Sequence, residues 1–461
     1  MDASLIAQWE QLCQALRPAF TSPTFATFLH IVTGWVLCRS KPTVTNLVRT
    51  IGHRLLGHAA KHWSTYHRFF YWASWSPDHL GQLLLQHVVA PLVRSHDTES
   101  KSHPGVIELL IDGTTTERCG KHVAFAGYFK DASVSNTVRS VVRWSHQWLI
   151  GVIALRPKKY APWVTALPVF AMLYRKPNDC DTHHPFRTQH QMAAAMIQQA
   201  HEALPEWTLR VTADGQFATR EVTGQLPEGV NLVSRIRRDA ALHALPPQRR
   251  QRGPGRPPKK GKRLPTPRVM AQRRKKGWQT IEVRKGATTV QREVYSLVCL
   301  WYHVCRDQPI KLVIVRDPKG HQQDDFFFGT DPAATEQEIV ERYYARWPIE
   351  ESIQQSKQFH GFEQVQGWCP KTVERQAPLA LFVQTLVKAW YLRCGHQARS
   401  ATPKGSQRDD WMPDKSHPSY LDMLATLRDV IWDHRINDNS GLWPRLRKIF
   451  QPLKFTLCAA T

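Results

Sequence analysis

Acidic residues are scarce in this 461-residue sequence, which carries 38 Asp and Glu against 62 Lys and Arg and a formal net charge of +24 at pH 7. A charge of this size says nothing about the fold, but it predicts attraction to a polyanion. An anionic membrane surface is the less favoured partner, because no basic amphipathic segment stands out. Nucleic acid is therefore the expected partner.

The sequence also lacks long hydrophobic runs, paired cysteines and internal repeats. No stretch reaches the length of a membrane span, and the N-terminus has no basic region followed by an apolar one, so neither a membrane anchor nor a secretion signal is expected. The nine cysteines are scattered, odd in number and contain no CxxC pair, which fits a reducing cytosol better than a secreted disulfide framework. We expect a cytoplasmic protein that associates with the nucleoid.

The most informative stretch runs from Tyr343 to Lys357. On an ideal helix, at about 100° per residue, four of its polar side chains project from one narrow face: Tyr343, Arg346, Glu350 and Lys357. Such a face suits a metal-bound phosphodiester, because a carboxylate holds the cation while Arg and Lys hold phosphate oxygens. Pro348 predicts a kink or a new helix start in the middle of the stretch. An exposed helix with an ion-paired face has the same spacing and remains an alternative.

Two aspartates upstream each follow an apolar run that is typical of a buried strand. Residues 106–111 lead into Asp112 and a Gly-Thr turn, and residues 209–213 lead into Asp214. Either aspartate alone is more typical of a turn or a helix N-cap. We expect five further elements in this region. Strands at 148–155 and 166–174 complete an antiparallel meander, a helix covers 187–204, a short helix follows Asp214, and a fifth strand covers 230–236.

The spacing YxxRxxxExxxxxxK resembles the signature of DDE transposases of bacterial insertion sequences, within their Tyr-Arg-Glu-Lys group. The resemblance covers about residues 106–388 and implies an α/β protein with a ribonuclease-H-like catalytic core, a mixed five-stranded sheet with flanking helices. It implies that Asp112, Asp214 and Glu350 are the catalytic acids and hold Mg²⁺ or Mn²⁺, with two ions per site. It also implies that Tyr343, Arg346 and Lys357 lie at the DNA.

The same resemblance implies metal-dependent strand cleavage at the terminal inverted repeats of a transposon and strand transfer to target DNA by a homodimer. One alternative is a ribonuclease-H-like nuclease or resolvase that cuts without joining. Another is a DNA-binding protein derived from a transposase, which the complete acidic set argues against. The long basic insertion and the N-terminal module favour a transposase over a small nuclease.

The expected domain organisation places the core on both sides of an insertion. Residues 1–100 read as an all-helical domain, either a helix-turn-helix-like DNA-binding module or a helical cap whose aromatic residues pack. Residues 105–238 and 329–395 form the two parts of the core, residues 239–328 a basic, β-rich insertion, and residues 396–461 a linker and a basic helical tail.

The first half of the insertion, residues 248–276, holds thirteen Lys or Arg and no acid. With its prolines and glycines, this composition predicts a flexible arm that becomes ordered on DNA. The candidate phosphate contacts are Arg256, Lys259, Lys260, Arg273, Arg274, Lys275 and Lys276. The segment around Arg256 resembles an AT-hook core, with nonspecific phosphate binding as the alternative. The second half alternates as strands do, and Trp278 or Trp301 either stacks on an unpaired base or packs in the core.

Overall fold

The computed structural model describes residues 3–56, 59–96, 105–131, 134–135, 138–247, 258–286, 288–398 and 415–438. The candidate Arg256, most of the polar segment expected after residue 396, and the tail beyond residue 438 lie outside these ranges. Within the described ranges, no helix is both long and apolar enough to cross a membrane.

The described residues between 3 and 96 form helices, as the sequence predicts. Their helices are α1 (Ala3–Gln14), α2 (Ser22–Leu37), α3 (Val44–Leu56), α4 (Trp63–Tyr71), α5 (Pro77–Leu84) and α6 (Ala90–His96), with a π-helical segment at Leu85–Val89 between the last two. The start of α5 has local causes. The Ser76 hydroxyl accepts a hydrogen bond from the His79 N–H, and Pro77 lies in the first turn, where a backbone N–H has no partner within the helix and so is not needed.

Ten strands of the described residues form one mixed sheet in the order β2-β3-β1-β5-β6-β10-β9-β8-β7, with β4 paired to β3. They are β1 (Val106–Glu117), β2 (Gly127–Lys130), β3 (Val142–Leu155), β4 (Thr165–Leu173), β5 (Thr208–Ala213), β6 (Asn231–Arg235), β7 (Gln279–Lys285), β8 (Thr288–Cys299), β9 (Ile310–Arg316) and β10 (Asp325–Gly329). The five expected core strands are all present: β1, β3 and β4 form the antiparallel meander, β5 lies parallel to β1, and β6 lies parallel to β5.

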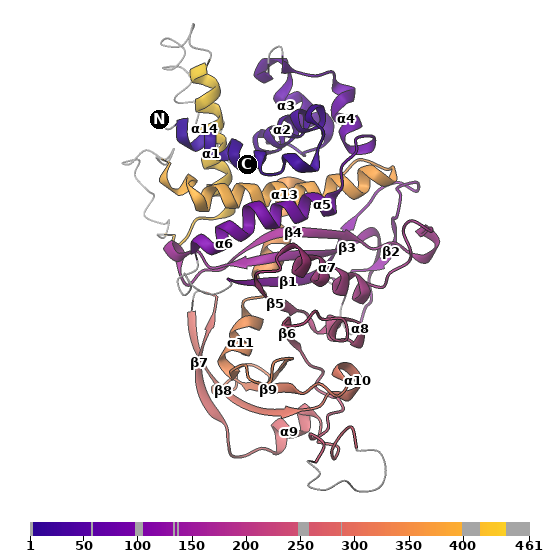
Figure 1. Cartoon of the computed structure of the whole chain (residues 1–461), viewed down its shortest axis with the longest axis vertical. Coiled ribbons are helices and arrows are strands. Elements are labelled where there is room, and N and C mark those ends of the chain that lie inside the picture. The colour runs from indigo at the N-terminus through magenta and orange to yellow at the C-terminus, as the bar shows by residue number, and fades with distance from the viewer. Residues whose placement is uncertain are drawn as a thin grey trace.

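The sheet is wider than the five strands expected, because the insertion continues it. The unpredicted strand β10 pairs antiparallel with both β6 and β9, and β8 and β7 follow outward. Phe327 and Phe328 of β10 are fully buried, which explains why this short apolar run pairs inside the sheet. Figure 1 shows β7, β8 and β9 extending from the core on the side opposite the N-terminal helices.

The expected turn after Asp112 is wrong, because β1 continues through Glu117. Its second half pairs with β3 from Asp112 opposite Ile150 to Glu117 opposite Ser145. Three consecutive threonines favour the extended backbone, and the fully buried Thr116 hydroxyl accepts from the Trp148 indole N–H at 3.2 Å. Asp112 therefore lies within a strand, and it is β5 that ends beside it.

The expectation of an unstructured arm is wrong for part of its length. Pro267–Arg273 form the helix α9, in which the Thr266 hydroxyl caps the Val269 N–H. Ala271 is buried, and its carbonyl accepts from Arg316 at 2.9 Å. The few apolar residues among the cations are enough to fix this turn of helix against the insertion strands.

The remaining helices pack on the sheet or close the core. They are α7 (Gln189–Ala203), α8 (Arg220–Thr223), α10 (Tyr302–Cys305), α11 (Glu336–Tyr344), α12 (Pro348–His360), α13 (Pro370–Arg393) and α14 (Tyr420–Asp438). The largely buried helix α13 lies between helices α1–α4 and the sheet (Figure 1). Its Thr385 hydroxyl donates to the Pro168 carbonyl of β4, and its Trp390 indole donates to the Leu5 carbonyl of α1.

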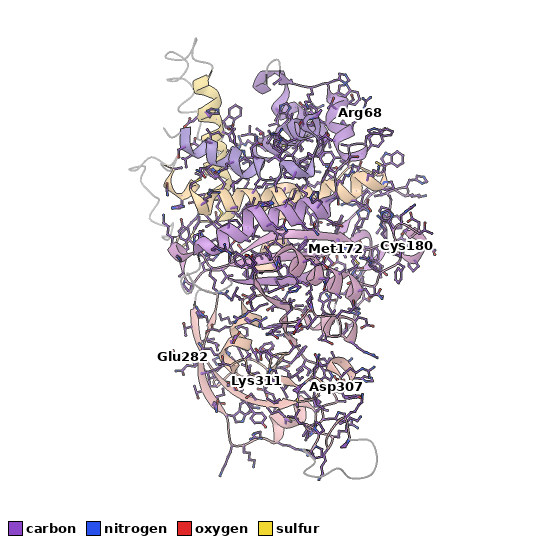
Figure 2. All side chains as sticks on the ribbon, in the orientation of Figure 1. Arg68, Met172, Cys180, Glu282, Asp307 and Lys311 are labelled. Atoms are coloured by element: carbon purple, nitrogen blue, oxygen red, sulfur yellow. The ribbon has the colours of Figure 1, made fainter. Side chains whose placement is uncertain are left out.

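One cluster of buried apolar residues joins the N-terminal helices, the sheet and the C-terminal helix α14. It extends from Leu5 in α1 to Ile431 in α14. Arg375 of α13 adds polar contacts, since its guanidinium donates to the carbonyls of Phe70 and Trp75. In Figure 2, Arg68 of α4 lies in the upper part of the molecule and Lys311 of β9 in the lower part, with Met172 of the sheet strand β4 between them.

Candidate active site

The signature stretch is divided between two helices at the expected position. α11 ends at Tyr344, and α12 begins at Pro348. The start of α11 is capped by Thr335, whose hydroxyl accepts from the Glu338 N–H at 3.1 Å. Tyr343 therefore lies on α11, Arg346 in the turn, and Glu350 and Lys357 on α12, so their positions do not follow from one continuous helix.

Buried Arg342 holds α11 against the sheet. Its guanidinium donates to the carbonyls of Val211 on β5 at 2.9 Å and Asn231 on β6 at 3.2 Å. Its Nε lies 3.8 Å from the carboxylate of Glu108 on β1. Three strands thus fix the last turn of α11, which places the next residue, Tyr343, at the end of β5.

Tyr343 contacts the second candidate acid directly. Its hydroxyl donates to Asp214 Oδ1 at 3.3 Å, and its ring stacks on Phe327 with centroids 4.5 Å apart. Burial raises the pKa of Tyr343 to about 12. The side chain is therefore a neutral hydrogen-bond donor that orients the Asp214 carboxylate.

Arg346 joins the other two acids. One guanidinium nitrogen, Nη1, donates to Asp112 Oδ2 at 2.6 Å, and Nη2 donates to Glu350 Oε1 at 2.5 Å. The Arg346 side chain is only 13% exposed. Burial alone would lower the pKa of Arg346, but the neighbouring Asp112 charge raises it above the ordinary value. Arg346 is thus a permanently charged link between β1 and α12.

Asp112 and Asp214 occupy adjacent strands at the same level. The parallel pairing of β1 with β5 ends at Ile111 opposite Ala213, and each aspartate is the next residue. Burial raises the pKa of Asp112, and the charge of Asp214 adds to that rise, while Arg346 and the Gly113 N–H oppose it. The electrostatics are those of two acids that need a nearby cation.

Lys357 ties the middle of α12 to β1. Its Nζ donates to the Thr115 carbonyl at 2.8 Å and lies 3.1 Å from the Glu363 carboxylate. The exposed fractions are 7% for Tyr343 and 13% for the Arg346 side chain. The first half of the signature is thus packed against the sheet and is not exposed to solvent, while Arg346 and Lys357 are both ion-paired.

The three acids have the chemistry of a divalent-cation site, although they are not arranged as one here. In the part of the chain that the structure describes, no three His, Cys, Asp or Glu side chains gather as a ligand set. Carboxylate oxygens are the ligands that Mg²⁺ and Mn²⁺ prefer. Asp112 and Glu350 already share one cation, the guanidinium of Arg346. The fit to a divalent ion therefore lies in the chemistry of the carboxylate oxygens and not in their present arrangement.

A cavity of about 620 Å³ opens beside Asp214 and Arg346 and brings together cations that the sequence did not indicate. Besides Asp214, Tyr343 and Arg346, its lining includes Arg156, Arg235, Arg284 and Lys285. Arg235 is the last residue of β6, which lies next to β5, the strand that precedes Asp214. Its position at a strand end could have identified it from the sequence as a residue near the acids. Arg284 and Lys285 end β7, and no spacing in the sequence indicates that they approach the acids.

The candidate contacts of the insertion lie elsewhere on its surface. Lys259, Lys260, Arg273, Arg274, Lys275 and Lys276 are all exposed. Arg274 stacks on Tyr295 at 3.8 Å from the ring centroid. Trp301 is buried, and Trp278 packs under Arg316, which lies 4.2 Å from its ring centroid. Both tryptophans therefore pack against other side chains of the protein.

A family model described as DDE superfamily endonuclease matches residues 15–292, which is more than half of the chain. The chain belongs to this family. Membership indicates a nuclease or transposase that acts on DNA, in a superfamily that generally uses divalent metals. The matched region contains Asp112 and Asp214 but ends before Tyr343, so the assignment to the Tyr-Arg-Glu-Lys group rests on the signature alone. No curated protein matches the chain.

Proposed function

We propose that this DDE endonuclease is a transposase with a ribonuclease-H-like core, which cleaves DNA at transposon ends and transfers the strands to target DNA. One observation carries the proposal. Arg346 bonds to both Asp112 and Glu350, which are 238 positions apart in the sequence, beside the end of β5, where Asp214 follows the strand. Two acids joined by one buried arginine, beside a third acid that is bonded to Tyr343, suit phosphodiester chemistry better than an ordinary surface.

Asp112, Asp214 and Glu350 are the proposed holders of two Mg²⁺ or Mn²⁺ ions. When bound, such ions activate water or a 3′-hydroxyl and stabilise the leaving 3′ oxygen of an in-line displacement. The protein supplies the positioning: Tyr343 orients the Asp214 carboxylate, and Arg346 and Lys357 hold the signature helix on β1 and offer positive charge to a phosphate. The cations of the 620 Å³ cavity would attract the DNA backbone to this edge.

The proposed partners are transposon-end DNA and target DNA, with two copies of the chain in the synaptic complex. The helical residues 1–100 and the basic insertion are the proposed end-binding regions, separate from the catalytic residues. A protein with this partner would be found with the nucleoid in the cytoplasm. The net charge of +24 supports the DNA partner, and the other assignments rest on the resemblance.

Binding to DNA should depend steeply on salt, and the exposed cations of the insertion should carry part of that dependence. Each phosphate contact contributes about −0.9 to the slope of log K against log salt concentration. Replacing Arg273, Lys275 and Lys276 together by Gln should therefore flatten the slope by about 1–3. The measurement is duplex binding by fluorescence anisotropy at several salt concentrations. An unchanged slope would mean that this part of the arm does not lie on DNA.

A joining assay separates the transposase from the endonuclease alternative. A DNA fragment that carries this gene with both of its flanks, a target plasmid and Mg²⁺ are incubated with the protein, and new junctions are sequenced. We expect element 3′ ends joined to the plasmid, and inverted repeats at the joined ends. Cut products without junctions would support a nuclease or resolvase and refute the transposase.

A further inference from the structure

One guanidinium occupies the position between two of the three acids. Arg346 donates to Asp112 at 2.6 Å and to Glu350 at 2.5 Å, one nitrogen for each carboxylate. The Asp112 side chain is 17% exposed and the Glu350 side chain 36% exposed, so water screens these contacts only in part. The oxygens that would hold a divalent ion are already neutralised by a cation of the chain itself.

A divalent ion and this guanidinium cannot both use the same oxygens. Mg²⁺ binds carboxylate oxygens at about 2.0–2.1 Å in nearly octahedral geometry, which requires direct access to their lone pairs. Two cations a few ångströms apart in a partly buried site also repel strongly. Arginine cannot relieve that repulsion by losing its proton. Asp112 Oδ2 and Glu350 Oε1 therefore become available to a metal ion only when Arg346 moves.

The surroundings of Arg346 offer a destination for the guanidinium. Arg346 lines the 620 Å³ cavity together with Arg235, Arg284 and Lys285, cations that would attract a DNA phosphate. The same lining also holds four carboxylates: Asp214, Asp325, Glu341 and Glu351. Arg235 and Arg284 already pair with Asp325 and Glu341 respectively. The partners of Arg346, in contrast, are the acids that a metal ion would take over. A phosphate accepts the same planar pair of N–H bonds that a carboxylate accepts.

We propose that Arg346 is an internal counter-ion that keeps divalent metal out of the acidic site until a DNA phosphate draws its guanidinium away from Asp112 and Glu350. This inference rests on the proposed function, since it assumes that the three acids bind the metal. It makes metal binding and DNA binding one linked equilibrium, in which each ligand raises the affinity for the other by the same factor. A free protein would then hold little metal and cleave little DNA at random.

The test measures Mn²⁺ binding to the full-length protein without DNA, by the electron paramagnetic resonance signal of free Mn²⁺. Arg346→Gln should bind Mn²⁺ more tightly than the wild type, by a factor within the roughly 5- to 150-fold range of typical site couplings. Arg346→Lys keeps one charge but cannot bridge two carboxylates, so its affinity should be intermediate. Arg284→Gln is the matched control: it removes one positive charge from the same cavity without touching the three acids, and it should match the wild type.

A DNA arm tests the linkage itself. A mixed-sequence duplex, with Mn²⁺ bound to duplex alone subtracted, should raise the Mn²⁺ affinity of the wild type several-fold and that of Arg346→Gln much less. Equal enhancement in both proteins, or none in the wild type, would overturn the linkage. Thermal melting of each variant checks that it is folded.

Adding Asp112→Asn to Arg346→Gln separates the two proposals. The added substitution should abolish the gain in Mn²⁺ affinity. If Arg346→Gln binds Mn²⁺ no better than the wild type, yet binding still depends on Asp112, the counter-ion inference fails and the metal site stands. If Mn²⁺ binding never depends on Asp112, both the inference and the proposed metal site fail.

Discussion

Replacing any one of Asp112, Asp214 and Glu350 by its amide should reduce the rate of DNA cleavage on the order of a thousandfold. This is the upper end of the rate loss that follows when one electrostatic stabiliser is removed from an active site. Asn and Gln keep the shape of the side chain but lose the negative charge that holds a divalent ion. Binding to DNA should be kept, because the substitutions leave the cationic surfaces intact. The measurement is single-turnover cleavage in Mg²⁺ together with duplex affinity.

Asp325→Asn is the matched control for these three substitutions. Asp325 lines the same cavity and pairs with Arg235 at 2.7 Å, so the control removes an equal charge nearby without touching the three acids. We expect cleavage within a few-fold of the wild type. Any of the three amide variants that still cleaves at a rate near normal would remove its residue from the catalytic set.

Arg346→Ala and Lys357→Ala should weaken cleavage far more than DNA binding, and their losses should not add. Both residues join α12 to β1, Arg346 through Asp112 and Lys357 through the carbonyl of Thr115. Residues in one network couple by about 0.5–3 kcal/mol. The measurement is single-turnover cleavage of pre-bound DNA by both single variants and the double variant.

An exposed ion pair would give a different result, at most about 1 kcal/mol and no defect in the chemical step. Arg237→Ala serves as the control, because Arg237 is 76% exposed and pairs with Asp239 in its own loop. If Arg346→Ala and Lys357→Ala cleave DNA at normal rates at saturating protein, both residues have only a structural role. Strict additivity would mean that the two side chains act independently.

The core strands and the signature helices were predictable because their causes are local. Apolar β-branched runs specify β1, β3, β5 and β6, and a proline with no N–H to donate specifies the start of α12. A fixed spacing of four residues was enough to suggest the family, and the family match over residues 15–292 supports that suggestion at the level of DDE endonucleases. Patterns of this kind act over a few residues, so they can be read along the chain.

The wrong predictions concern segments whose conformation depends on residues that are far away in the sequence. The threonines after Asp112 looked like a turn, but β3 lies alongside and pairs with them, so β1 continues. The cationic arm looked unable to fold, but Arg316 of β9 donates to the Ala271 carbonyl and holds its helix in place. β10 was missed because five residues carry too little pattern without the β6 and β9 neighbours that complete its hydrogen bonds.

By itself, the sequence determined the order of the core strands, the three candidate acids and the basic character of the chain. Only the tertiary structure decided that Arg346 bonds to Asp112 and Glu350, that Tyr343 bonds to Asp214, and that β7 brings Arg284 to the same cavity. A helical face specifies which side chains point the same way, but not what they meet. Their partners depend on how β1, β5 and the two signature helices pack, and that packing is set by burial and hydrogen bonding across the whole sheet.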